Sequence, residues 1–133
     1  MKLKAVIVED ESSSREILRN YLAKYCKTVD VLGEAASVKE AIKILAQTMP
    51  DLVFLDVEMP FGNAFDLLDQ LPDRSFETVF VTAYNSYALE ALNNHAAYYL
   101  IKPINIDELI EAVSYVTEIK EKENILEDRI LKS

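Results

Sequence analysis

Acidic side chains follow two of the apolar stretches in this sequence. Glu9 and Asp10 end KAVIVED, and Asp56 ends LVFLD, with Glu58 two residues further on. Carboxylates that lie close together repel one another and need a cation to stay ionised. Oxygen ligands favour a hard ion such as Mg²⁺. The sequence therefore predicts a magnesium site made by Glu9, Asp10 and Asp56, to which the backbone carbonyl of Glu58 adds an oxygen.

A hydroxyl group and an amine follow two further apolar stretches, since Thr82 ends VFVT and Lys102 follows YYLI. Together with Mg²⁺ they suit phosphoryl transfer to a carboxylate, in which Asp56 is the nucleophile. The transition state spreads negative charge over three oxygens of the phosphoryl group. Mg²⁺ can neutralise one oxygen, Lys102 a second, and Thr82 with nearby backbone N–H groups the third. We therefore expect Asp56, Thr82 and Lys102 to carry the chemistry.

The elements that must bring these residues together alternate along the chain. Short runs rich in Val, Ile, Leu and Phe predict strands, and apolar residues at helical spacing predict helices. Serines are available to cap the first helix, and Ser37 with Glu40 predicts a capping box at the second. The predicted strands are 4–9, 28–35, 51–56, 78–83 and 96–101, and the predicted helices are 12–25, 37–49, 63–71, 86–94 and 105–119.

This alternation predicts an α/β fold, a doubly wound five-stranded parallel sheet with helices on both faces. The strands at 51–56 and 78–83 are apolar throughout and belong in the centre, whereas the alternating strand at 28–35 suits an edge. The expected strand order is the flavodoxin-like 2-1-3-4-5. In such sheets the functional crevice lies beyond the carboxyl ends of the strands, which is where the residues singled out above fall.

Length and charge narrow the function further. A chain of 133 residues predicts one domain. Its 14 basic and 23 acidic residues give a formal net charge of −9, so we expect no direct nucleic-acid binding. No apolar run approaches the ~20 residues of a membrane span, and acids come too early in MKLKAVIVEDE for a signal peptide. We therefore expect no membrane association and a cytoplasmic location. Cys26 is expected to be a small, partly buried side chain.

Four segments together resemble the receiver domain of bacterial two-component response regulators: VIVEDE, PDLVFLDVEMP, VFVTAY and YYLIKPI. The resemblance covers roughly residues 3–118. VTAYNSYALEAL with YYLIKPI is most similar to receivers of the LytTR (LytR/AlgR) class. The resemblance implies that Asp56 is the phosphoacceptor and that Glu9 and Asp10 bind Mg²⁺. It also implies that Thr82 is the switch hydroxyl and that Lys102 contacts the phosphoryl group.

The resemblance further implies how a signal enters and leaves the domain. A sensor histidine kinase would donate the phosphoryl group, so the domain is a signalling switch more than an enzyme. Tyr99 matches the switch aromatic, and the Lys102–Pro103 bond is expected to be cis. The face made by the fourth helix, fifth strand and fifth helix would change and could form a homodimer. DNA would be bound by a C-terminal domain absent from this chain.

Two positions depart from the family pattern. Glu9 stands where many members have Asp, which keeps the charge but adds a methylene. Ala64 stands where Gly is usual, and a positive φ at that position would cost on the order of 1 kcal/mol. Gly62 could supply the flexible point instead.

Three alternatives stay open at this point. A haloacid-dehalogenase-like phosphatase also forms an aspartyl phosphate beside Mg²⁺, and a pseudo-receiver would bind partners without phosphorylation. Tyr99 could pack in the core without switching.

The organisation of the C-terminus is also open. We divide the chain into a receiver domain at 1–118 and an extension at 119–133. That extension is either a prolonged last helix or a linker toward an effector domain.

Overall fold

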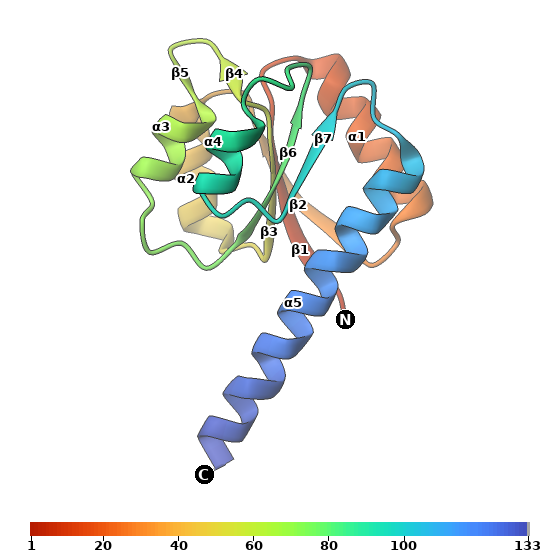
Figure 1. Cartoon of the computed structure of the whole chain (residues 1–133), viewed down its shortest axis with the longest axis vertical. Coiled ribbons are helices and arrows are strands. Elements are labelled where there is room, and N and C mark those ends of the chain that lie inside the picture. The colour runs from red at the N-terminus through yellow and green to blue at the C-terminus, as the bar shows by residue number, and fades with distance from the viewer. Residues whose placement is uncertain (133) are drawn as a thin grey trace.

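Five parallel strands form the central sheet of the computed structural model, which describes residues 1–132 (Figure 1). Their order is β2-β1-β3-β6-β7, with bounds β1 Leu3–Val8, β2 Val29–Ala35, β3 Leu52–Leu55, β6 Glu77–Thr82 and β7 Tyr98–Ile101. The short strands β4 (Glu58–Met59) and β5 (Gly62–Asn63) pair separately and antiparallel. Counting only the strands of the large sheet, the order is the predicted 2-1-3-4-5.

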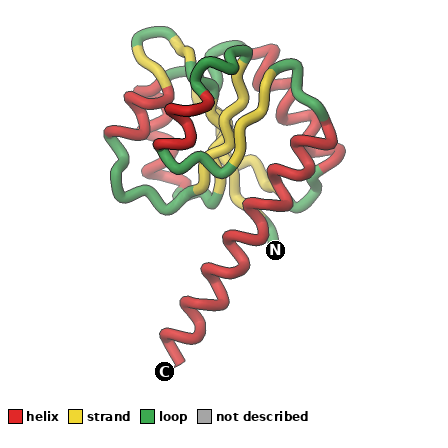
Figure 2. Tube along the Cα trace, viewed as in Figure 1, coloured by secondary structure: helices red, strands yellow, loops and turns green. Residues whose placement is uncertain are grey.

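Helices cover both faces of the sheet, as the alternating pattern predicts (Figure 2). Their bounds are α1 Ser12–Tyr25, α2 Val38–Thr48, α3 Ala64–Asp69, α4 Ala88–Asn93 and α5 Ile106–Lys132. In Figure 1, α1 and α5 lie on one side of the sheet and α2, α3 and α4 on the other. Among residues 1–132, no helix combines the length and the apolar character that crossing a membrane requires.

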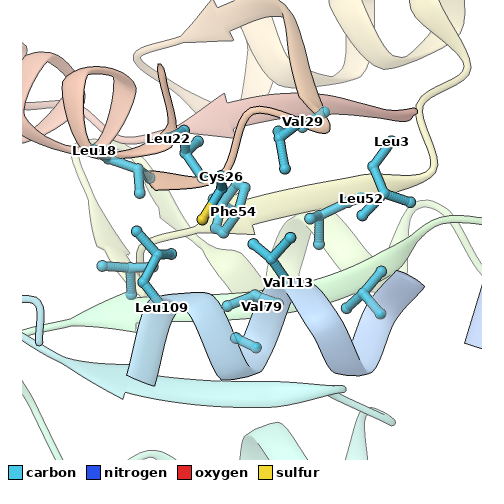
Figure 3. Close-up of a cluster of buried hydrophobic side chains, with 14 of the residues drawn as sticks. Leu3, Leu18, Leu22, Cys26, Val29, Leu52, Phe54, Val79, Leu109 and Val113 are labelled. Carbon is cyan, nitrogen blue, oxygen red and sulfur yellow. The ribbon is translucent and has the colours of Figure 1, made fainter. Parts of the chain in front are cut away.

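Two hydrophobic clusters fill the two layers because successive residues of a strand face opposite sides. On one face, Ile7 of β1 and Phe54 of β3 pack with Leu18 and Leu22 of α1 and with residues of α5 (Figure 3). On the other face, Val6 and Val8 pack with residues of α2 and α3. All four residues of β3 are buried, which fits the prediction of a central strand.

Several local predictions need correction. The first helix is capped at Glu11, whose side chain makes no cap hydrogen bond, so the serines do not cap it. Ser37 does cap α2 by accepting from the backbone N–H of Glu40 at 3.2 Å. The Glu40 carboxylate accepts from Ala36 at 2.7 Å, one residue before the cap, so the predicted capping box forms only in part.

In the loop after β3, the alternative in which Gly62 supplies the flexible point is confirmed. Positive φ angles occur at Phe61 (62°) and Gly62 (148°), and Ala64 is the first residue of α3. Ala64 therefore bears no left-handed strain, because the tight turn lies two residues earlier. Asn63 caps α3 by accepting from Phe65 and Asp66, a cap that the sequence reading missed.

The last helix is longer than its predicted bounds of 105–119. It continues to Lys132 and projects away from the body of the molecule (Figure 1). The prolonged-helix reading of the extension therefore holds for the residues described, and Ser133 lies outside them.

Candidate functional site

Hydrogen bonds of the parallel sheet continue past the strand ends and fix the backbone of the predicted site residues. The N–H of Glu9 donates to Ala35 O at 2.9 Å, and that of Asp56 donates to Val8 O at 3.0 Å. Lys102 N donates to Thr82 O at 2.8 Å. These residues come from four strands that lie far apart in the sequence. The backbone hydrogen bonds of the sheet therefore fix the relative positions of these site residues independently of their side-chain contacts.

The three predicted acids converge at this rim. One carboxylate oxygen from each of Glu9, Asp10 and Asp56 lies within 4.8 Å of the others. Glu9 and Asp56 are buried, and Asp10 is half-buried. Lys102 Nζ donates to Asp56 Oδ2 at 3.0 Å and also contacts Glu9 Oε1. The ammonium group thus bridges two acids that would otherwise repel one another.

This crowding changes the acidity of the groups. Burial raises the pKa of Glu9 to about 7, and the charge of Asp56 adds to the rise, while the hydrogen bond from Lys102 opposes it. For Lys102, burial alone would lower the pKa, but the bonds to Glu9 and Asp56 outweigh it and raise the pKa. Lys102 therefore remains a cation at neutral pH, whereas Glu9 is close to its titration point.

Thr82 and Tyr99 lie beside this cluster on neighbouring strands. Thr82 has no exposed surface, and within residues 1–132 its hydroxyl has no hydrogen-bond partner. Tyr99 is half-buried, its ring stacks on Phe80 with centroids 5.9 Å apart, and its hydroxyl donates to the Tyr84 carbonyl. An unpaired buried hydroxyl is costly unless a partner binds it. Tyr98 and Tyr99 point to opposite faces of the sheet, because successive residues of a strand alternate.

A cavity of about 650 Å³ opens above the acids. Asp10, Asp56 and Lys102 line it, as do Glu58, Tyr84 and Tyr87. The Glu58 carboxylate is exposed and accepts a hydrogen bond from Tyr87 Oη at 2.8 Å. Hydrogen bonding to Glu58 raises the pKa of both Tyr87 and Tyr84. The Glu58 side chain is thus held by a tyrosine and is not a member of the acid cluster.

Sequence reasoning missed two contributors to this site. Tyr87 immediately precedes α4, and a tyrosine at a helix start gives no signal that its hydroxyl reaches a strand residue 29 positions earlier. Arg15 Nη1 donates to the carbonyls of Glu9 (2.8 Å) and Asp10 (3.1 Å) and so holds the turn that presents both acids. Arg15 lies in the first turn of α1, six positions after Glu9, and no periodicity of the sequence indicated this contact.

The donor set fits the predicted metal. Three carboxylate oxygens within 4.8 Å of one another offer the hard ligands that Mg²⁺ prefers. Glu9 and Asp56 are buried, so a divalent cation would add to the compensation of their desolvation that Lys102 provides. The Lys102–Pro103 bond is cis, as expected.

The arrangement defines a class of α/β domain that solved structures share. The REC domain of AraT, a response regulator from Geobacillus stearothermophilus, superposes with a TM-score of 0.82 over 93% of this chain and 99% of its own, at 28% identity. The model of the response regulator receiver domain family matches residues 5–114. The chain therefore belongs to the response regulator receiver domains. Because the chain belongs to this family, the haloacid-dehalogenase-like alternative is excluded.

Two curated relatives support the assignment to the response regulators. An uncharacterised response regulatory protein of Vibrio cholerae is 40% identical over 84% of this chain and 47% of its own length. The sensory transduction protein LytT of Bacillus cereus is 33% identical over 91% of this chain and 50% of its own. The similarity to LytT agrees with the LytTR-class resemblance. The chain spans about half the length of the curated relatives it matches.

Proposed function

We propose that this receiver accepts a phosphoryl group on Asp56 from the phosphohistidine of a sensor histidine kinase. The observation that supports it most strongly is the buried Asp56 carboxylate, which Lys102 contacts at 3.0 Å beside Glu9 and Asp10. An Asp56 oxygen attacks phosphorus, and the bond from phosphorus to the histidine nitrogen breaks. The nitrogen keeps the electron pair of that bond.

Each residue at the rim has a distinct part in this proposal. Glu9, Asp10 and Asp56, with the backbone carbonyl of Glu58, would hold Mg²⁺. The bound ion would neutralise charge on the phosphoryl oxygens. Lys102 is a fixed cation that stabilises a second oxygen, and the unpaired Thr82 hydroxyl is free to donate to a third.

The effect of phosphorylation is then transmitted through the switch residues Thr82 and Tyr99. When Thr82 bonds the phosphoryl group, the space beside it changes and Tyr99 follows on the adjacent strand. Tyr99 already contacts the loop that leads into α4 through the Tyr84 carbonyl. The α4–β7–α5 face, the fourth helix, fifth strand and fifth helix of the prediction, is thereby rearranged. On this face the apolar side chains of Leu89, Leu92 and Ile101 are exposed, which suits a homodimer contact.

The output is a proposal drawn from relatives. BtsR of Escherichia coli, named a transcriptional regulatory protein, is 32% identical over 92% of this chain and 52% of its own length. We infer that α5 leads to a DNA-binding domain outside this chain. A receiver with a net charge of −9 would not contact DNA itself. The cytoplasmic location expected from the sequence stays a prediction.

Intact-mass measurement after incubation with acetyl phosphate and Mg²⁺ tests the proposal. We expect the wild type to gain the mass of one phosphoryl group, and the gain to disappear in Asp56→Asn or after chelation of Mg²⁺. Asp69→Asn is the matched control, because Asp69 is an exposed acid at the end of α3. No gain in the wild type would support a pseudo-receiver, and an unchanged gain in Asp56→Asn would move the acceptor elsewhere.

A further inference from the structure

A tyrosine at the start of α4 reaches across the mouth of the phosphoacceptor cavity. Tyr87 Oη donates to Glu58 Oε1 at 2.8 Å, and both residues line the cavity above Asp56. Glu58 lies on β4 and Tyr87 immediately precedes α4, so the bond joins two loops that frame the site. None of the roles assigned above uses this bond.

The Tyr87 hydroxyl is held in place by its ring. The ring lies 6.2 Å from that of Phe65 in α3 and 6.1 Å from that of Tyr84, edge to face with the latter. Aromatic contacts of this kind fix a side chain at low cost in conformational entropy. The donor is therefore pre-oriented, and it helps to hold the exposed Glu58 carboxylate, to which Tyr84 is also hydrogen-bonded.

The position of this carboxylate matters because the cavity is already rich in negative charge. Asp10, Glu11 and Asp56 line it together with Glu58, and among the described residues that line it Lys102 is the one cation. A small phosphodonor arrives as an anion. A mobile carboxylate two residues from Asp56 would repel that anion and compete for Lys102.

We propose that Tyr87 is a positioning residue for phosphoryl transfer, because its hydroxyl holds the Glu58 carboxylate at the α4 side of the cavity mouth. This inference rests on the proposed function of Asp56. Tyr87 touches neither the phosphodonor nor the reacting atoms, and it acts through Glu58.

The test is a double-mutant cycle on the rate of phosphorylation by acetyl phosphate with Mg²⁺, followed by intact mass. Tyr87→Phe keeps the ring and removes the hydroxyl. We expect its second-order rate constant to fall by roughly three- to tenfold, the scale of one ordinary hydrogen bond, since this one is exposed to solvent. Glu58→Gln alone should be faster than the wild type, and Tyr87→Phe should have no effect in the Glu58→Gln background.

The dependence of the phosphorylation rate on ionic strength distinguishes this role from a merely structural one. The deficit of Tyr87→Phe should shrink as ionic strength rises, because salt screens the freed carboxylate from the approaching donor. Tyr98→Phe is the matched control, since Tyr98 Oη donates to Glu111 at 3.0 Å on β7 and α5, outside the cavity lining. Its rate should equal that of the wild type.

The outcomes separate this inference from the proposed function. A wild type that gains no phosphoryl group refutes both. A phosphorylated wild type with an equal rate in Tyr87→Phe refutes the positioning role alone. So does a deficit of the same size in the Glu58 and Glu58→Gln backgrounds, which would mean that Tyr87 acts by packing. If Tyr87→Phe unfolds, a rate of Glu58→Gln at or below that of the wild type still overturns the inference.

Discussion

Glu9 is a buried acid in contact with Lys102. Burial and the negative charge of Asp56 raise the pKa of the Glu9 carboxyl group, and Lys102 lowers it. The net pKa of about 7 lies above the ordinary 4.5. The folded, metal-free protein therefore binds this proton more tightly than the unfolded chain does. Glu9 makes the site sensitive to pH near neutrality.

This shift sets the sign of a pH dependence. The contribution of Glu9 to stability is fully present below the unfolded pKa of 4.5 and is lost as pH rises through about 7. Without Mg²⁺, the free energy of unfolding should fall by on the order of 1–2 kcal/mol between about pH 5 and 8. Urea denaturation with a chelator measures it. Glu9→Gln should flatten this slope, and an unchanged slope would assign it to another group.

At the scale of elements, α5 is held to the body by a buried lysine. Lys120 Nζ donates to Ser75 O at 2.5 Å in the loop between α3 and β6, and it pairs with Glu123 at 3.2 Å. It also opposes the burial that raises the pKa of Glu77. Lysines are rarely this buried unless they are paired. This contact lies where the helix leaves the body, so it fixes the direction of the projecting segment.

Replacement of this lysine should loosen the base of the projecting helix. Lys120→Met keeps the side-chain volume but leaves the Ser75 carbonyl unpaired and the Glu77 carboxylate uncompensated. We expect a loss of about 1–3 kcal/mol in the free energy of unfolding, measured by urea denaturation. Lys122→Met, an exposed neighbour on the same helix, should change it by less than about 0.5 kcal/mol. Equal effects of the two replacements would contradict this account.

At the scale of the whole molecule, the burial of side chains decreases along α5 toward its C-terminal end. Val116 is fully buried and Lys120 nearly so, whereas Ile125, Leu126 and Leu131 are exposed. The predicted boundary after residue 118 therefore falls inside the packed part of α5. From these contacts we propose that the packed body ends near residue 123, and the boundary after residue 118 stays a prediction. The projecting segment lies beyond it.

Two truncations test this boundary. A chain that ends at residue 124 should keep its free energy of unfolding within about 0.5 kcal/mol of the full chain, because residues 125–131 are exposed. A chain that ends at residue 118 should lose about 1–3 kcal/mol, because it lacks Lys120 and the half-buried Ile119. Thermal or urea unfolding measures both. Equal stability of the two chains would support the boundary at 118.

The sequence by itself determined the order of elements, the central and edge strands and the acids that meet at one rim. Residues such as Asp56 and Lys102 follow apolar strands directly, and parallel strands present their carboxyl ends at the same edge. Their convergence therefore follows from local pattern and topology.

Only the tertiary structure decided the contacts of side chains between loops. The bond from Tyr87 to Glu58 spans 29 residues, and that from Lys120 to Ser75 spans 45. The turn at Phe61 and the burial of Lys120 likewise depend on packing that the periodicity of one segment does not encode. Strand periodicity fixes which face a residue occupies, but the three-dimensional approach of neighbouring segments selects its partner.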